Sequence, residues 1–127
     1  MTESGRRDAR RTAFILLYQW DVTGQPLASL YEGAVDSYAC ELAEGVVEGA
    51  EELDRRLTAA SEGWPADRLG AVERSILRLA LFELDRGLPG AIAIDEAVRL
   101  AKRYASDEAA KLVNGVLGRI HREREVV

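Results

Sequence analysis

Apolar residues are densest over residues 67–84, where the sequence reads DRLGAVERSILRLALFEL. At about 100° per residue they cover most of a helical wheel, and only Arg74, Arg78 and Asp85 occupy a narrow charged arc. A helix that is apolar almost all round must be enclosed by other helices. This stretch is therefore expected to form a central buried helix in which the following side chains are almost fully buried: Ile76, Leu79 and Phe82.

Two carboxylates of this predicted helix fall among its apolar positions. Glu73 and Glu83 both lie in apolar sectors of the wheel, and a charge enclosed by apolar side chains is usually paired. An arginine on a neighbouring helix would pair with either carboxylate, and the dipole at the helix N-terminus would also stabilise Glu73. A functional role is the alternative for both residues.

Helical periodicity recurs along the whole chain, and the alternating pattern of strands is absent from the sequence. The sequence predicts an all-α fold of about seven helices, over residues 4–22, 26–34, 36–61, 65–69, 71–86, 91–104 and 107–123. Gly63-Trp64-Pro65 interrupts the pattern. We expect one domain over residues 1–127, made of two small bundles near 1–62 and 63–127 that share the central helix.

The first predicted helix has two different faces. One is an apolar stripe, and the other carries Arg7, Arg11, Phe14 and Tyr18 at spacings of four, three and four residues. Arginines interleaved with aromatic rings suit RNA, because guanidinium groups bind phosphates and rings stack on bases. Alternatively, Phe14 and Tyr18 pack against the second half of the protein, and the arginines are only solvated. The pattern alone leaves both interpretations open.

The predicted helix over residues 36–61 is amphipathic, with an apolar stripe opposite a row of five glutamates. That acidic face would repel a phosphate backbone, so nucleic acid is expected to bind elsewhere on the molecule. Gly45 and Gly49 border the apolar stripe, and their lack of a side chain would let another backbone approach closely.

Charge and composition narrow the classes of function. The net charge of −5 belongs to the middle of the chain, because residues 25–66 carry two basic against nine acidic side chains and the two ends are close to neutral. A single Cys40 and a single His121 provide neither an internal disulfide nor a zinc site. No apolar run approaches a membrane span or a secretory signal. These features predict a cytoplasmic protein without a membrane segment or a bound metal.

Enzyme signatures are also absent from the sequence. It holds no phosphate-binding glycine loop, nucleophile elbow or metal-ligand cluster. Asp95 and Glu96 are neighbours, so they point about 100° apart on a helix and do not converge as a catalytic pair. We expect a binding module with no cofactor and no enzymatic activity.

Three stretches, taken together, resemble one family. RRDARRTAFILLYQWDVTG is similar to the arginine-rich first helix of the NusB family of transcription antitermination factors, and WPADRLGAVERSILRLALFEL is similar to its core helix. PGAIAIDEAVRLAKRYASDEAAKLVNGVLGRI resembles the family's AINEA…LAK…KFVNGVL pattern. The stretches keep the family's order and approximate spacing over a little more than half of the chain. They depart from it at Asp8, within the arginine cluster, and at Leu112, which replaces an aromatic ring.

The resemblance implies a helical protein that binds a boxA-like element of nascent ribosomal RNA together with the ribosomal protein NusE, in a complex on RNA polymerase. The implied RNA contacts are Arg6, Arg7, Arg10, Arg11, Tyr18, Glu108, Lys111 and Leu112. Glu73 and Arg78 match positions that the family uses at the same RNA and partner surface. Phe14 and Tyr18 are expected to bind a partner because two aromatic residues lie opposite the core stripe.

Other interpretations stay open at the level of the sequence. The first is a homodimer that covers Phe14 and Tyr18, because the family includes both monomers and homodimers. A second is an RNA-binding module related to the N-terminal part of ribosomal RNA cytosine methyltransferases. A third is a helical scaffold that binds only protein.

Overall fold

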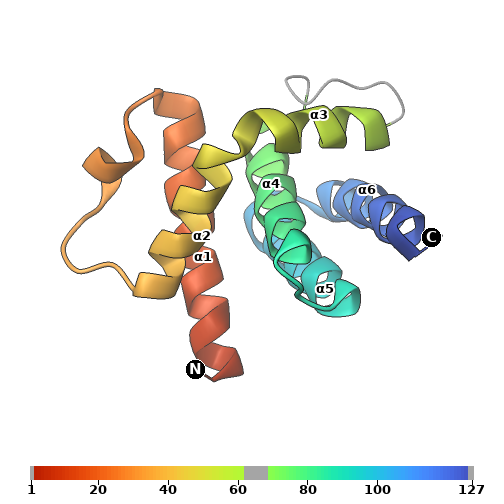
Figure 1. Cartoon of the computed structure of the whole chain (residues 1–127), viewed down its shortest axis with the longest axis horizontal. Helices are drawn as coiled ribbons and strands as arrows, with labels where there is room; N and C mark the ends of the chain where they lie inside the picture. The colour runs from red at the N-terminus through yellow and green to blue at the C-terminus, as the bar shows by residue number, and fades with distance from the viewer. Residues whose placement is uncertain (1, 62–68, 126–127) are drawn as a thin grey trace.

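The chain is entirely helical over the residues that the structure, a computed structural model, describes, which are 2–61 and 69–125 (Figure 1). Six α-helices and one short 3₁₀ helix follow one another in the order α1 (Glu3–Thr23), η1 (Leu27–Leu30), α2 (Ser37–Glu48), α3 (Ala50–Ala60), α4 (Ala71–Asp85), α5 (Gly90–Tyr104) and α6 (Asp107–Glu125). The predicted all-α class is confirmed. The predicted helix over residues 65–69 lies outside the described residues, except for Leu69, which is in a bend.

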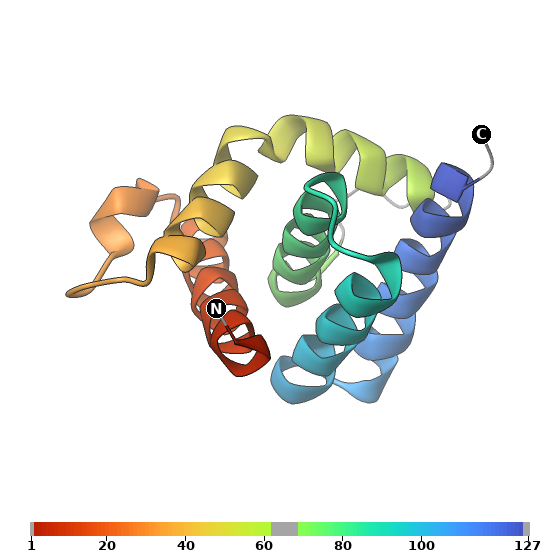
Figure 2. The ribbon, with the colours of Figure 1, turned by 60° about the horizontal axis from the view of Figure 1, so that its bottom comes forward.

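Helix α4 is the centre of the fold, as its apolar sequence requires. It packs against each of the other five α-helices, with α1 and α2 on one side of it and α5 and α6 on the other (Figures 1 and 2). Ile76 and Leu79 are fully buried, as predicted. None of the described helices is long and apolar enough to cross a membrane.

The prediction that Phe82 is fully buried is wrong. Its ring is only partly buried, with the guanidinium of Arg86 5.4 Å from the ring centroid. On its inner side the ring fills the space left by Gly45, where an added Cβ would lie 2.2 Å from Phe82 Cζ. The group that approaches Gly45 closely is therefore the side chain of Phe82 and not another backbone. Phe82 packs at the edge of the contact between α2 and α4.

The predicted helix over residues 36–61 is two helices that meet at Gly49. The Gly49 N–H donates to the Gly45 carbonyl as α2 ends, and the Gly49 carbonyl accepts from the Leu53 N–H as α3 begins. Glycine is a weak helix former, which makes this a favourable place for the helix to break. The break turns the chain so that α3 crosses one end of α4 (Figure 1).

Short caps place α5 and α6 beside α4. Gly87 adopts a φ of 96°, in the left-handed region that residues with a side chain rarely adopt. Pro89 then precedes the first turn of α5. At the next turn the Ser106 hydroxyl accepts a hydrogen bond from the Ala109 N–H, which begins α6. As a result α5 and α6 lie side by side (Figure 2).

Candidate nucleic-acid interface

The four arginines at the start of α1 do not share one environment. Arg10 is only 3% exposed, and its Nε donates to both carboxylate oxygens of Glu83 at 2.9 Å. Arg10 is therefore not an exposed cation of the surface in this conformation, because its Nε is paired with Glu83 inside the protein. Its position on the helix explains the burial, since Phe14 and Leu17, four and seven residues further on, are also buried.

Glu83 thus has the arginine partner that its apolar surroundings required. It also accepts a hydrogen bond from the Tyr38 hydroxyl at 3.2 Å. Burial raises the pKa of the Glu83 carboxyl, and the Arg10 guanidinium acts in the opposite direction. Burial and the nearby Glu83 charge together raise the pKa of Tyr38.

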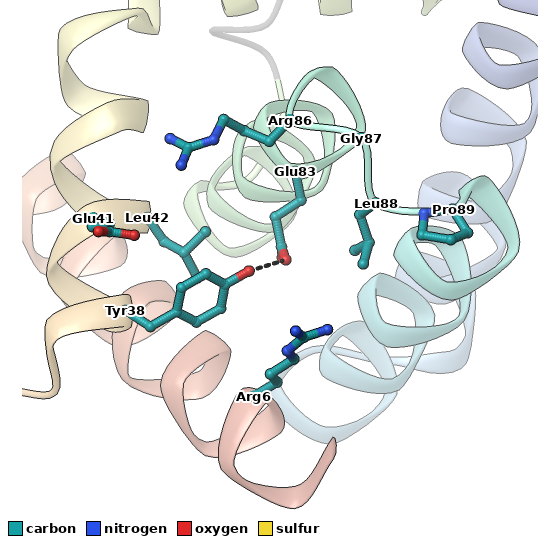
Figure 3. A pocket seen from close by; sticks show the side chains of 9 residues that line it. All are labelled: Arg6, Tyr38, Glu41, Leu42, Glu83, Arg86, Gly87, Leu88 and Pro89. Carbon is teal, nitrogen blue, oxygen red and sulfur yellow. Dashed lines mark hydrogen bonds between the residues drawn. The ribbon is translucent and has the colours of Figure 1, made fainter. Parts of the chain in front are cut away.

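A pocket of about 320 Å³ opens beside this hydrogen bond (Figure 3). Glu83 and Tyr38 point toward each other in it, and Arg6 comes from α1 on the opposite side from Arg86 (Figure 3). Arg6 is exposed. It lines this pocket, whereas Arg7 and Arg11 line a second one.

Arg7 and Arg11 line a second hollow, a cleft of about 330 Å³ between α1 and α5, together with the buried Arg10. Their side chains are 43% and 38% exposed, and each has a carboxylate partner. Arg7 Nε donates to Glu96 Oε1 at 2.8 Å, and Arg11 Nη2 donates to Asp8 Oδ1 at 2.9 Å. Both guanidinium groups are therefore accessible to a ligand in this conformation.

Two residues of α5, Arg99 and Arg103, line the same cleft, and sequence reasoning missed them. Arg103 lies in the last turn of α5, where the helix dipole favours a cation. Their i, i+4 spacing repeats that of Arg7 and Arg11, which was the one signal in the sequence that could have found them.

The structure separates the two aromatic residues of α1. Phe14 is 3% exposed and packs on Tyr104, with 5.1 Å between ring centroids. A role for Phe14 at a partner surface is therefore wrong in this conformation, and the packing interpretation holds for it. Tyr18 is 36% exposed and forms an exposed apolar strip with Ile15 and Val22, at helical spacings of three and four residues.

The predicted contacts on the last helix lie in its first turns. Glu108, Lys111 and Leu112 are all exposed. Since Phe14 of α1 touches Tyr104, the last residue of α5, the middle of α1 lies close to the turn from which α6 begins. The middle of α1 and the start of α6 thus lie in the same part of the molecule.

The two predicted partner residues of α4 have internal contacts. The carboxylate of Glu73 lies over Gly70 at the start of α4, where an added Cβ would be 2.1 Å from Oε2, and this agrees with stabilisation by the helix dipole. Arg78 is buried and donates to both oxygens of Asp54, at 2.8 and 2.7 Å. It also contacts Asp21. Arg78 therefore fastens α4 to α1 and α3.

Residues of the described ranges form no group of three or more His, Cys, Asp or Glu side chains that could hold a metal ion. The candidate site is instead an arginine-bearing surface of α1, bordered by α5 and by the start of α6. Its chemistry is that of binding, through guanidinium groups, one exposed ring and a few carboxylate and ammonium groups.

Comparison with known proteins gives the family. The NusB family profile matches residues 7–122. The chain is 46% identical over 120 residues to the transcription antitermination protein NusB of Rubrobacter xylanophilus, a match that covers 88% of this chain and 86% of that protein. It is 39% identical over 130 residues to NusB of Aquifex aeolicus, which covers 92% and 87%.

Solved structures agree. A chain of the complex of antitermination factors NusB and NusE with dsRNA matches with a TM-score of 0.85 and 34% identity, over 96% of this chain and 99% of that one. The solution structure of NusB from Aquifex aeolicus matches with a TM-score of 0.78 and 38% identity, over 92% and 87%. The fold and surface define a small helical binding protein. This chain belongs to the NusB family, whose members are transcription factors and not enzymes.

Proposed function

We propose that this chain is a transcription antitermination factor that binds boxA-like RNA in ribosomal RNA leader and spacer transcripts together with NusE, within a complex on RNA polymerase. Relatives named as antitermination proteins support the proposal, as does the match to a NusB–NusE complex with RNA. The matched proteins are close to this chain in length, which disfavours a module cut from a methyltransferase. The cytoplasm, where transcription takes place, is the proposed location.

One observation carries the RNA-binding part of the proposal. Arg7 and Arg11 are exposed one helical turn apart, and Tyr18 is exposed two turns beyond Arg11 on the same helix. Guanidinium groups neutralise phosphates, and an exposed ring offers a face on which an unpaired base stacks. The nearby start of α6 adds three exposed residues, Glu108, Lys111 and Leu112. The Glu108 carboxylate is a hydrogen-bond acceptor for base amino groups.

Arg6 and Arg10 take different parts in this proposal. Arg6 extends the positive surface around α1 toward the pocket beside Tyr38. Arg10 acts as a positioning residue, because its pair with Glu83 fixes the start of α1 on α4. The proposed RNA contacts are therefore the remaining predicted residues: Arg6, Arg7, Arg11, Tyr18, Glu108, Lys111 and Leu112.

The proposed protein-binding surface includes the apolar strip of Ile15, Tyr18 and Val22, since exposed apolar patches mark interaction sites. Glu73 is at the start of α4, next to Arg74, which pairs with Asp21 of α1. Arg78 contacts the same Asp21 from inside the protein. NusE is the proposed occupant, and a second copy of the chain competes for the strip in the homodimer interpretation. The two small bundles near residues 1–62 and 63–127 stay part of the proposal for the domain organisation.

A fluorescence titration tests the function directly. The probes are a labelled single-stranded boxA-like RNA, a scrambled single strand and a duplex of the boxA-like sequence, each with and without NusE. We expect NusE to tighten binding of the boxA-like RNA more than of the scrambled one, and the RNA to tighten NusE binding by the same factor. Equal affinity for both single strands in the presence of NusE would rule out the antitermination function. A preference for the duplex would retain RNA binding and reject stacking of unpaired bases on Tyr18.

A further inference from the structure

The cleft between α1 and α5 has a local excess of positive charge in a protein whose net charge is −5. Two carboxylates, those of Asp8 and Glu96, lie among the residues that line it. Five arginines face them: Arg7, Arg10, Arg11, Arg99 and Arg103. A concave surface with such an imbalance concentrates anions.

The arginines form two rows across the cleft. Arg7 and Arg11 on α1, and Arg99 and Arg103 on α5, are each four residues apart, which is about 6 Å along a helix axis. Each row therefore presents two guanidinium groups one turn apart. Two facing rows suit an extended anion with repeated charges better than they suit a single small ion.

The carboxylates of the cleft neutralise these rows only in part. Glu96 is buried between Arg7, at 2.8 Å, and Arg99, whose Nε is 3.7 Å from Glu96 Oε2. The guanidinium of Arg103 lies 5.2 Å from the centroid of the Tyr104 ring, and no carboxylate of the described residues pairs with it. Arg99 and Arg103 thus retain hydrogen-bond donors for a ligand.

The floor of the cleft also has unused donors. Arg10 lines it and is only 3% exposed, and its Nη1 and Nη2 have no hydrogen-bond partner among the described residues. Buried polar groups without a partner are rare and costly. The unpaired donors of a buried arginine point to a missing acceptor, which is an anionic oxygen or a water held beside one.

We infer that the α1–α5 cleft is a binding subsite for successive phosphates of an RNA backbone, in which Arg99 and Arg103 are further contact residues and Glu96 occupies the place of a phosphate in the free protein. The inference rests on the proposed function and extends it to α5. Phosphate binds guanidinium groups bidentately, as a carboxylate does. An incoming phosphate therefore exchanges with the Glu96 carboxylate at Arg7 and Arg99.

A salt titration of RNA binding tests the subsite. The double variant Arg99→Ala/Arg103→Ala is compared with the parent and with Arg55→Ala/Arg119→Ala, a control that removes two exposed arginines on α3 and α6. Each lost phosphate contact lowers the magnitude of the negative log–log salt slope by about 0.7 on single strands. We expect a drop of about 1.4 for the α5 double variant, on boxA-like and scrambled RNA alike, and no drop for the control. A slope equal to that of the parent would overturn the inference.

Glu96→Gln gives a test in the opposite direction. The amide keeps the size of the side chain but no longer competes as an anion, so both RNAs should bind more tightly than they bind the parent at the same salt concentration. Weaker binding by a folded Glu96→Gln variant would overturn the exchange. A competition experiment with millimolar inorganic phosphate is a further test. Phosphate should displace RNA no better than chloride of equal ionic strength does. Displacement by phosphate alone would show that the cleft takes a small free anion instead.

The outcomes separate this inference from the proposed function. A parent that does not prefer boxA-like RNA, with a reduced slope for the α5 variant, refutes antitermination and retains the cleft. A boxA preference with an unchanged slope retains antitermination and rejects the cleft. A parent that binds none of the RNAs refutes both.

Discussion

Arg10 and Glu83, which are 73 residues apart in the sequence, form a buried ion pair in which Arg10 Nε lies 2.9 Å from both carboxylate oxygens. The pair joins the start of α1 to the last turns of α4, and Tyr38 adds α2 through its hydroxyl. Three helices are therefore fixed to one another by a polar contact inside an apolar core. The exposed arginines of α1 take their positions from this attachment.

Arg10→Met is expected to destabilise the protein strongly, because it leaves the Glu83 carboxylate buried without its cation. Removing one partner of a buried ion pair costs about 3–5 kcal/mol. The double variant Arg10→Met/Glu83→Leu should recover much of this loss, since two apolar side chains pack in place of the pair. Urea denaturation measures both, and a single variant as stable as the parent would contradict the role of the pair.

Leu79→Ala should cost about 2–5 kcal/mol, because Leu79 is fully buried at the centre of α4 and its truncation leaves a cavity. Leu112→Ala is a matched control, since it removes the same atoms from an exposed position on α6. Its effect on the free energy of unfolding should be within about 0.5 kcal/mol. Similar losses for the two variants would refute the central position of α4.

Phe14→Glu and Tyr18→Glu should differ although both replace an aromatic residue of α1. The first places a charge in the core beside Tyr104 and should unfold the protein. The second alters an exposed ring and should leave the melting temperature close to that of the parent. Circular dichroism and light scattering check both. A folded, monomeric Phe14→Glu variant of a dimeric parent would restore Phe14 to the surface and to a dimer interface.

Two glycine substitutions should have opposite signs. Gly115 has no neighbour within 4 Å of an added Cβ, so Gly115→Ala should stabilise the protein by up to about 1 kcal/mol through helix propensity. At Gly45 an added Cβ would meet the Phe82 ring at 2.2 Å, and Gly45→Ala should cost about 1–3 kcal/mol. Thermal unfolding ranks the two variants, and an equal gain for both would show that Phe82 does not fill this space.

The central helix was predictable because a helix that is apolar on nearly every side has only one place in a small helical protein. The break between α2 and α3 at Gly49 was not predictable, because apolar residues on either side of it, such as Val46 and Leu53, remain in one helical register. The pattern therefore continues through a bend that tertiary packing imposes.

For the candidate site, the sequence identified the arginine-bearing helix but not which arginines it exposes. Arg10 and Arg11 are neighbours, but the helix points Arg10 toward the buried side, where Glu83 of α4 pairs with it. Arg99 and Arg103 escaped prediction for a related reason, because they join the site only when α5 packs beside α1. Contacts between segments far apart in the sequence are not encoded in local periodicity.

The central claim, RNA binding through the exposed arginines of α1, is tested most directly by one titration. Labelled boxA-like single-stranded RNA is bound in the presence of NusE, at several salt concentrations, by the parent, by Arg7→Ala/Arg11→Ala and by Arg55→Ala. Arg55 pairs with Glu52 three residues away, as Arg11 pairs with Asp8, which makes it a matched control. We predict that the double variant binds more weakly, with a negative log–log slope smaller in magnitude by about 1.4, and that Arg55→Ala binds as the parent does. Unchanged affinity and slope for a folded Arg7→Ala/Arg11→Ala variant would contradict the account and move the RNA away from α1.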